Sequence, residues 1–483
     1  MEAIISSNGG KVRDFIDMDT IYKQDKPLDE CGIIGVYAPG KNDIARSVYF
    51  GLHALQHRGQ DSAGIAANSG GKIQYYKDRG LVQEVFSDEI IERLKGDIVI
   101  GHVRYPARDD THVINAMPLV VYYKDGALAL AHNGSLVNGR TLREEMQESG
   151  FIFQTSIDAE IVAVLIAKNL RDYSIEDAIL KTLNTVKGAY ALVMTAEEKL
   201  IGARDPNGIR PLCIGKTKDG FVLASESCAF SLLGAKLIRD VEPGEMVVIE
   251  DKEIKSYKFD KKSKRAGCSF EYAYIARPDS DIDKRNVYMA RSMCGRVLAK
   301  EAPADADMVI SVPDSGTVAA IGFAEASGIP YGEGFIKNRY IGRTFIQPNQ
   351  RMREMSVRLK LNVIKDNVKG KRIIMVDDSI IRGTTSNNIV KMLRDAGAKE
   401  VHVRVASPPV TSPCFFGIDT PDKDELVAFA KSVDEIGEGI GADSLAYLSI
   451  EGMREAIALG DVLCLACFDG KYPMEVPAPE WED

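Results

Sequence analysis

Long apolar runs are missing from this chain of 483 residues. No stretch approaches the roughly 18 apolar residues that a membrane-spanning helix needs, so we expect no membrane partner. The first thirty residues also lack the continuous apolar core of a secretory signal, because Lys11, Arg13, Asp14 and Asp17 are scattered through them. Both absences indicate a cytoplasmic protein.

An excess of positive charge is missing too, since the formal net charge is -9 at pH 7. This charge argues against a nucleic-acid partner held by bulk electrostatics, although it leaves room for a local basic pocket that binds phosphates. Internal repeats and low-complexity segments are also absent. Small anionic substrates therefore fit the composition, whereas duplex DNA does not.

Structural disulfides are not expected among the eight cysteines, because a reducing compartment disfavours them. Clustered cysteines are then better candidates for metal ligands or nucleophiles. Cys464 and Cys467 form a C-x-x-C pair, while Cys268 and Cys414 stand alone. By spacing alone, this set is compatible with a zinc site, an iron–sulfur cluster or unrelated buried thiols.

The length of the chain predicts two domains, because hydrophobic cores tend to split beyond roughly 250 to 300 residues. Residues 31–260 contain short β-rich stretches broken by glycine turns, with helical spacing around residues 45–55 and 158–170. Residues 251–265 are rich in lysine and predict a surface crossing between the domains.

Residues 261–483 have a different periodicity, in which apolar strands alternate with helical runs as in a parallel sheet. The clearest strands are residues 307–312, 372–376 and 401–405. The chain after Asp424 is expected to be mainly helical until Gly460. The second domain is therefore predicted to be α/β, with helices toward its C-terminus.

Residues 372–386 are the most informative stretch, because an apolar strand ends in Asp377 and Asp378 and continues into a Gly-Thr-Thr-Ser turn and a helix. Backbone N–H groups at a helix start form a cradle for an anion, and Gly383 lets the backbone approach a phosphate closely. The two acids can accept hydrogen bonds from ribose hydroxyls. An isolated acid pair would favour a simple capped turn, but the whole combination favours a ribose 5-phosphate site.

This stretch resembles the phosphoribosyl pyrophosphate (PRPP) signature of type I phosphoribosyltransferases, in the form found in the amidophosphoribosyltransferase family. Residues 312–316 resemble the pyrophosphate loop of that family, and residues 334–348 its flap over PRPP. The resemblance implies that PRPP is bound by Asp377, Asp378, Ser379, Arg382, Gly383, Thr384, Thr385 and Ser386. The pyrophosphate would be met by Asp314, Ser315, Lys337, Arg339 and Arg343. Magnesium, which the pyrophosphate charge calls for, would be held at Ser315, Asp377 and Asp378.

A second candidate site begins at Cys31, which opens the run Cys-Gly-Ile-Ile-Gly-Val-Tyr. One cysteine on a strand is usually a buried structural residue. This run, however, resembles the start of class II glutamine amidotransferases, in which loss of the upstream residues makes the cysteine the N-terminus. Its free α-amine, with an unperturbed pKa of about 8, can then serve as the general base for the thiol. The resemblance implies that residues 1–30 are a propeptide and that Cys31 is the catalytic nucleophile.

Further motifs resemble the same amidotransferases. They imply that Arg104 pairs with the α-carboxylate of glutamine and that Asp158 receives its α-ammonium group. The Asn133 amide and the Gly134 backbone N–H are implied as the oxyanion hole. Two segments without an assigned role complete the likeness, residues 53–64 and 204–212.

One short stretch departs from the family pattern. Family members usually follow Arg-Tyr-Pro with Thr-Ala-Gly, whereas this chain has Ala107, Arg108, Asp109 and Asp110. Loss of the threonine hydroxyl removes a contact to the glutamine carboxylate that is worth about 0.5 to 1.5 kcal/mol. Arg108 offers a substitute cation, or the aspartates repel the carboxylate. Met117 stands at a position where glutamine is common in the family, and it is a second departure that indicates altered glutamine binding.

The cysteine-bearing segments resemble the cluster-bearing, Bacillus-type branch of the family. This resemblance implies a [4Fe–4S] cluster held by Cys268, Cys414, Cys464 and Cys467. Three other cysteines match no ligand position and are expected in the core: Cys213, Cys228 and Cys294.

The resemblance implies an α+β N-terminal nucleophile (Ntn) glutaminase domain, an αββα sandwich over residues 31–260, followed by an α/β type I phosphoribosyltransferase domain over residues 261–483. Glutamine hydrolysis would supply ammonia to PRPP and give 5-phosphoribosylamine, the first step of purine synthesis. Feedback inhibition by purine nucleotides and a homotetramer are also implied. Two alternatives remain: a relative with an impaired glutaminase that uses free ammonia, and a regulatory protein that binds PRPP or nucleotides and uses the cluster as a sensor.

Overall fold

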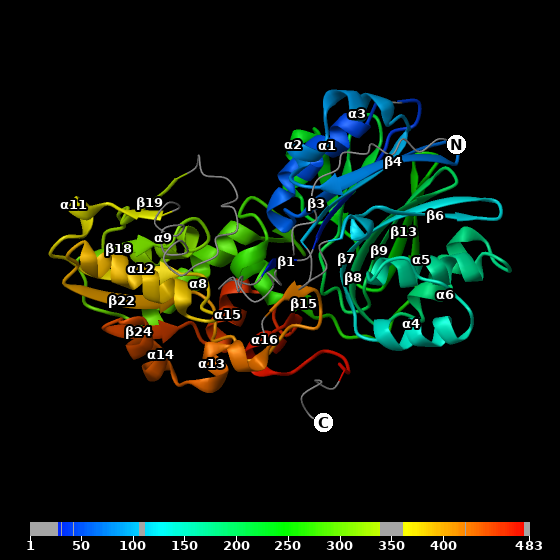
Figure 1. The fold of residues 1–483 in the computed structure, drawn as a ribbon. Helices are drawn as coiled ribbons and strands as arrows, with labels where there is room; N and C mark the ends of the chain where they lie inside the picture. The colour runs from blue at the N-terminus through cyan, green and yellow to red at the C-terminus, as the bar shows by residue number, and fades with distance from the viewer. Residues whose placement is uncertain are drawn as a thin grey trace, which may run out of the picture.

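The computed structural model describes residues 28–29, 31–41, 43–105, 112–338, 361–420 and 422–477. These residues form two lobes that lie side by side, an N-terminal lobe in blue to green and a C-terminal lobe mainly in yellow and orange (Figure 1). Among them, no helix is long and apolar enough to cross a bilayer.

Two antiparallel sheets form the N-terminal lobe. The first has the strand order β12-β10-β11-β2-β5-β3-β4, and the second has the order β14-β13-β9-β8-β7-β6. The strands of the first sheet are β2 (Cys31–Tyr37), β3 (Ser62–Ser69), β4 (Lys72–Arg79), β5 (Ile98–Arg104), β10 (Cys213–Lys216), β11 (Phe221–Ala224) and β12 (Lys236–Asp240). Those of the second sheet are β6 (Leu119–Tyr123), β7 (Gly126–Leu136), β8 (Gly188–Ala196), β9 (Lys199–Arg204), β13 (Glu245–Glu250) and β14 (Glu253–Lys258).

Alternation of side chains along the strands builds four layers. Ile33 and Ile100 pack between the two sheets, whereas Ile34 and Val99 face the helices on the other side. The first sheet is covered by α1 (Ala45–Ala54), α2 (Val82–Val85), α3 (Asp88–Arg93) and α7 (Cys228–Leu232). The second sheet is covered by α4 (Gly139–Glu148), α5 (Asp158–Asn169) and α6 (Ile175–Leu183). The predicted αββα sandwich is confirmed.

Some elements of this lobe differ from the prediction. Helical spacing predicted α1 and α5 but missed α4 and α6, and α4 buries only Gly139, Leu142 and Met146 of a largely charged segment. The lysine-rich residues 251–265 were predicted as a crossing, but they contain the edge strand β14, because Ile254 packs onto the inter-sheet core. Tertiary contacts decided both cases.

A parallel sheet with the order β18-β21-β22-β24 forms the C-terminal lobe. Its strands are β18 (Met308–Ser311), β21 (Arg372–Asp377), β22 (Glu400–Val405) and β24 (Ser444–Tyr447). The longer helices are α8 (Val287–Glu301), α9 (Thr317–Ser327), α12 (Thr384–Asp395), α14 (Val433–Ile440) and α15 (Ile450–Ile457). The predicted α/β domain is confirmed, with the correction that β24 interrupts the segment that was expected to be mainly helical.

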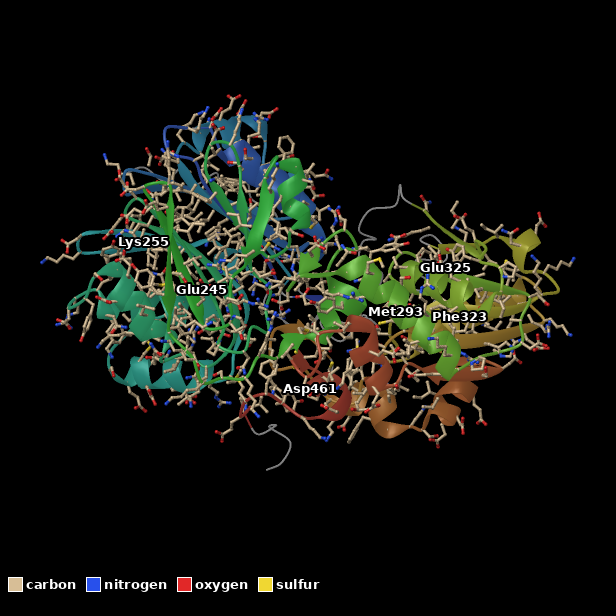
Figure 2. All side chains as sticks on the ribbon, turned by 180° about the vertical axis from the view of Figure 1, so that it is seen from behind. Glu245, Lys255, Met293, Phe323, Glu325 and Asp461 are labelled. Carbon is tan, nitrogen blue, oxygen red and sulfur yellow. The ribbon has the colours of Figure 1, made fainter. Side chains whose placement is uncertain are left out.

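Two cores cover the faces of this sheet. Phe323 of α9 lies in one of them and Met293 of α8 packs against it, on the side of the molecule seen in Figure 2. Ile389 of α12 and Ile436 of α14 pack on the other face.

Short elements complete the described chain: η2 (Gln56–Arg58), η3 (Val113–Asn115), η4 (Glu271–Ile275), η5 (Lys423–Glu425), α11 (Lys365–Val368), α13 (Val427–Ala430) and α16 (Ala466–Asp469). Four two-stranded pairs join them: β1 (Leu28–Asp29) with β23 (Ile418–Asp419), β15 (Gly267–Cys268) with β25 (Leu463–Cys464), β16 (Asp281–Ile282) with β17 (Arg285–Asn286), and β19 (Phe335–Lys337) with β20 (Leu361–Val363).

Candidate functional site

Cys31 and Arg104 are neighbours across the first sheet. Cys31 opens β2 and lies directly opposite Arg104, the last residue of β5. Opposed residues on antiparallel strands project to the same face, and Ile33 shows that this face looks toward the second sheet. Both side chains are buried, with 4% and 5% of their surfaces exposed. The strand register therefore places the predicted nucleophile beside the predicted carboxylate ligand.

Asn133 and Gly134 lie on β7 of the second sheet. Asn133 is fully buried, yet neither its Oδ1 nor its Nδ2 has a hydrogen-bond partner among the described residues. Gly134 has a φ of 129°, and a Cβ there would lie 2.1 Å from the carbonyl oxygen of Ala189, so only glycine fits. An unpaired buried amide is costly unless a ligand uses it. This arrangement suits the predicted oxyanion hole.

Asp158 is the first residue of α5 and is tied to the same strand. Its Oδ2 accepts hydrogen bonds from the Leu136 N–H at 2.8 Å and from the Ser135 hydroxyl at 3.4 Å. Burial raises the pKa of the Asp158 carboxyl, and these two hydrogen bonds oppose the shift. These hydrogen bonds hold the Asp158 carboxylate at Leu136 of β7, which is two residues after Gly134.

The segment that leads into Asp158 is fixed by buried polar contacts. The Glu160 carboxylate accepts from the backbone N–H groups of Gln154 and Thr155, both at 2.8 Å. Arg143 donates to the carbonyl of Thr155 at 2.8 Å and to that of Ile157 at 3.1 Å. The predicted ammonium ligand therefore stands on a rigid support.

Residues 107–110, the departure from the family pattern, lie outside the described residues. Met117, the other departure, is described and is buried. A Cβ added at Gly64 of β3 would lie 2.2 Å from the Met117 carbonyl oxygen. The Met117 backbone thus lies directly on the face of the sheet that carries Cys31 and Arg104.

Arg58 is a buried cation that sequence reasoning did not single out, although it lies within the quoted residues 53–64. Its Nε donates to the carbonyl oxygen of Cys31 at 3.3 Å, and its guanidinium pairs with Glu226 and Glu271. Although burial opposes ionisation, His57 and Arg58 hold the pKa of Glu226 well below its usual range. Glu271 belongs to η4 of the following segment, so this network joins the nucleophile to the C-terminal lobe.

The predicted phosphate cradle lies between β21 and α12. Asp377 and Asp378 are almost completely buried at the end of β21, where Asp378 N–H donates to Asp377 Oδ1 at 2.9 Å. The Ser379 hydroxyl donates to Asp378 Oδ2 at 2.6 Å. Gly383 caps α12 in the left-handed conformation, with a φ of 81°, which disfavours other residues. The backbone thus turns into α12 with its first N–H groups directed at the loop.

The remaining cradle residues have different surroundings. Arg382 pairs with Glu425 of η5, with nitrogen–oxygen distances of 2.8 and 3.0 Å, and so anchors the loop to the following helices. Ser386 is buried in α12, Thr385 is half-buried and Thr384 is exposed. A cavity of about 310 Å³ opens between this loop and α13 and α14. Of the predicted PRPP-binding residues, Arg382, Gly383 and Thr384 line this cavity, and its opposite wall comes from residues that are distant in the chain and were not predicted.

The predicted pyrophosphate loop lies between β18 and α9. Asp314 accepts a hydrogen bond from Lys337 Nζ at 2.6 Å, which brings the loop and the start of the flap together. Ser315 belongs to the same turn. Gly316 approaches β21 so closely that a Cβ would lie 2.6 Å from the Val376 carbonyl oxygen. The other two predicted flap cations lie outside the described residues: Arg339 and Arg343.

The four predicted cluster cysteines come from three separate segments and line one cavity: Cys268 of β15, Cys414, and the pair Cys464 of β25 and Cys467 of α16. Parallel pairing places Cys268 beside Cys464. The rest of the wall is largely apolar, with Ile209, Phe416 and Ile418 among its residues. Burial raises the pKa of the Cys464 thiol to about 12, and it raises the pKa values of the Cys268 and Cys467 thiols well above their ordinary value.

Four thiols around one cavity are the type and number of donors that a [4Fe–4S] cluster uses. Within the described ranges, no three His, Cys, Asp or Glu side chains converge on one point that could hold a metal ion. In a [4Fe–4S] cluster each thiolate binds a different iron, so the sulfurs surround the group without converging. The three cysteines predicted to be core residues are buried in hydrophobic clusters, as expected: Cys213, Cys228 and Cys294.

Comparison with known proteins decides the family. A family model for a glutamine amidotransferase domain matches residues 108–231. The amidophosphoribosyltransferase of Archaeoglobus fulgidus is 50% identical over 456 residues, which cover 94% of this chain and 100% of that protein. This chain belongs to the amidophosphoribosyltransferase family. The family member of Bacillus subtilis is also 50% identical, over 93% of this chain and 95% of its own length.

Solved structures agree with this family assignment. The glutamine PRPP amidotransferase of B. subtilis in complex with ADP and GMP superposes with a TM-score of 0.88 at 50% identity, covering 92% of this chain and 98% of that one. The chain is thus an enzyme of purine biosynthesis that combines a glutamine amidotransferase with a phosphoribosyltransferase. The relatives do not favour the regulatory protein or the glutaminase-impaired paralogue that the sequence left open.

Proposed function

We propose that Cys31 and the residues around it form the glutaminase site of this family member. The Cys31 thiol attacks the side-chain amide carbon of glutamine, and the free α-amine of a processed N-terminus accepts the thiol proton. The protonated α-amine returns this proton to the leaving nitrogen, ammonia departs and a thioester forms, and water then releases glutamate from the thioester and restores the thiol. The proposal is carried by one observation, the unpaired and fully buried Asn133 amide in the lobe whose β2 begins at Cys31.

The surrounding groups recognise the substrate and stabilise charge. The Asn133 amide and the Gly134 N–H donate to the oxyanion that forms during attack. Arg104 pairs with the α-carboxylate, and Asp158 accepts from the α-ammonium group. Because Asp158 and Gly134 are both held by β7, recognition of the substrate and stabilisation of the transition state share one rigid element.

The second proposed site is the loop after β21, which binds PRPP. The backbone N–H groups at the start of α12 hold the 5-phosphate, together with Ser379, Thr384, Thr385 and Ser386. Asp377 and Asp378 accept hydrogen bonds from the ribose hydroxyls. Asp314 and Ser315 lie on the pyrophosphate side, and Lys337, Arg339 and Arg343 supply cations to it. Ammonia then displaces pyrophosphate at C1 with inversion.

Two inorganic groups belong to this proposal. Magnesium would be held at Ser315, Asp377 and Asp378, where it would neutralise the departing pyrophosphate. The four cysteines around the apolar cavity would hold the [4Fe–4S] cluster, whose role is to tie β15, β25, α16 and the loop around Cys414 together. That loop also reaches the other lobe, since a Cβ at Gly417 would lie 2.7 Å from Gly134 Cα.

Regulation and assembly are proposed from the relatives. The B. subtilis structure is described as a complex with ADP and GMP, and a second solved structure, with the same TM-score of 0.88, as the allosteric regulatory enzyme of purine biosynthesis. We expect purine nucleotides to inhibit this chain as well, in a cytoplasmic homotetramer. Residues 1–30 act as a propeptide, whose loss exposes the Cys31 amine.

Parallel turnover assays with glutamine and with ammonium as the only nitrogen source test the proposal. We expect the wild-type enzyme to use both. Cys31→Ala is expected to lose glutamine use and keep ammonia-dependent synthesis, because the transferase has its own site. Cys213→Ala, which changes a buried cysteine outside both sites, is the matched control and is expected to keep both activities. Loss of both activities in a folded Cys31→Ala protein would contradict two separate sites.

A further inference from the structure

The inner face of the first sheet carries a buried hydroxyl, that of Ser62, to which neither site assigns a role. In the register of the strands, Ser62 of β3 lies opposite Arg104 of β5, and Arg104 lies opposite Cys31 of β2. Directly opposed residues project to the same face of an antiparallel sheet. The three side chains therefore form one row, and Ile33 and Ala66, which share their face, show that the row looks into the space between the sheets.

The Ser62 hydroxyl has no hydrogen-bond partner in the part of the chain that the structure describes, and only 2% of the residue is exposed. Buried polar groups are nearly always paired, and a lone one is unfavourable. Ala63 and Ala66 show that β3 accommodates alanine at buried positions. A hydroxyl kept at such a position beside an arginine therefore indicates a ligand that completes its hydrogen bonding.

The spacing of the row fits a glutamine molecule. Neighbouring strands lie about 4.8 Å apart, so Ser62 and Cys31 are separated by two spacings, about 10 Å, with Arg104 between them. If the side-chain amide of glutamine is at Cys31, the other end of the substrate points toward Arg104 and Ser62. A carboxylate there can accept from the guanidinium on one side and from the hydroxyl on the other.

We propose that Ser62 is a substrate-binding residue that donates its hydroxyl hydrogen to the α-carboxylate of glutamine, next to Arg104. This inference rests on the glutaminase assignment of Cys31 and Arg104. It deepens that assignment, because Ser62 supplies a hydroxyl donor in a chain whose Ala107 lacks the threonine hydroxyl of the family pattern. The α-carboxylate of glutamine would thus have a neutral donor, the Ser62 hydroxyl, beside the Arg104 guanidinium.

Steady-state kinetics of Ser62→Ala test the proposal. We expect the KM for glutamine to rise roughly tenfold or more, as loss of one hydrogen bond to a charged group implies, with kcat and ammonia-dependent synthesis unchanged. Ser69→Ala, at the exposed far end of the same strand, is the matched control and is expected to match the wild type. Ser62→Thr keeps the hydroxyl, is expected to keep the glutamine KM within a few fold, and gives a second readout if Ser62→Ala does not fold.

A truncated amide separates substrate binding from a structural effect. 4-Aminobutanamide has the amide and amine of glutamine but no α-carboxylate, so as a competing inhibitor it is expected to bind wild type and Ser62→Ala equally. An unchanged glutamine KM in Ser62→Ala, or an equal loss of affinity for both amides, overturns the role of Ser62. A wrong glutaminase assignment would give a different result, because the Cys31→Ala variant would then still use glutamine.

Discussion

Two buried asparagines of the N-terminal lobe differ in whether their side-chain amides are hydrogen-bonded within the protein. Asn68 is 1% exposed, and its amide donates to the Thr195 hydroxyl and to the Glu197 carbonyl, both at 2.7 Å. Asn133 is 0% exposed and has no partner for its amide among the described residues. The first amide is used by the fold, whereas the second is available to a substrate.

Replacing Asn133 by alanine is expected to lower kcat with glutamine by roughly 100- to 1,000-fold, because one oxyanion donor is lost. Ammonia-dependent synthesis should not change. The thermal midpoint should stay the same or rise, since the variant no longer buries an unpaired amide. Asn68→Ala is the matched control, for which we expect the reverse: a lower midpoint with glutamine kcat retained. A glutamine kcat for Asn133→Ala equal to that of the wild type would refute the oxyanion role.

Secondary-structure elements determine which side chains meet. A slip of one residue between β2 and β5 would turn Cys31 and Arg104 away from each other, because side chains alternate between the faces of a sheet. The Cβ clash at Gly134 and the left-handed cap at Gly383 place one glycine in each site where backbone N–H groups must be presented. Both sites therefore rely on backbone geometry as much as on side chains.

Residues 107–110, which depart from the family pattern, provide a test of the contact proposed for Ser62. Changing residues 107–109 to Thr-Ala-Gly is expected to lower the glutamine KM only slightly in the wild type, because Ser62 already supplies a hydroxyl. In the Ser62→Ala background the same change is expected to restore most of the lost affinity. Glutamine KM in the four-member cycle measures this coupling.

A large gain in glutamine-dependent rate from the change at residues 107–109 alone would have another meaning. It would indicate that Asp109 or Asp110 repels the substrate carboxylate, a like-charge effect that costs several-fold in affinity or more. The ammonia-dependent rate is the control in every member of the cycle, because neither the change at residues 107–109 nor Ser62→Ala is expected to affect the transferase.

The two lobes are joined by buried charge at the scale of the whole molecule. Arg58 of the first lobe pairs with Glu271, and Arg210 donates to the carbonyl oxygens of Phe416 and Gly417. Gly417 lies near Cys414, so the cysteine-lined cavity and the lobe interface share one loop. Residues Leu28–Asp29, upstream of Cys31, pair with Ile418–Asp419 of the same loop. The proposed processing point, the glutaminase and the cluster site thus meet in one region.

Protein purified without oxygen is expected to contain about four irons and four sulfides per chain, the stoichiometry of a Cys-ligated cubane. Cys464→Ser should lose the iron and the visible absorption, and should unfold at a lower temperature because the joined segments separate. Cys294→Ser, which changes a buried cysteine away from the cavity, is expected to keep both. Zinc in place of iron, with no visible absorption, would show that the ligand assignment is wrong.

Motifs that are local in the chain could be predicted from the sequence alone: the strand, acid pair and glycine turn at residues 372–386, the two-domain division, and the Cys31 strand. Their signals depend on periodicity and backbone requirements that neighbouring residues express. The charged helix α4, the strand β24 and the cavity shared by cysteines of three distant segments needed the tertiary structure, because each depends on contacts with residues far away in the chain. The same holds for Ser62, whose row with Arg104 and Cys31 exists only in the register of three strands.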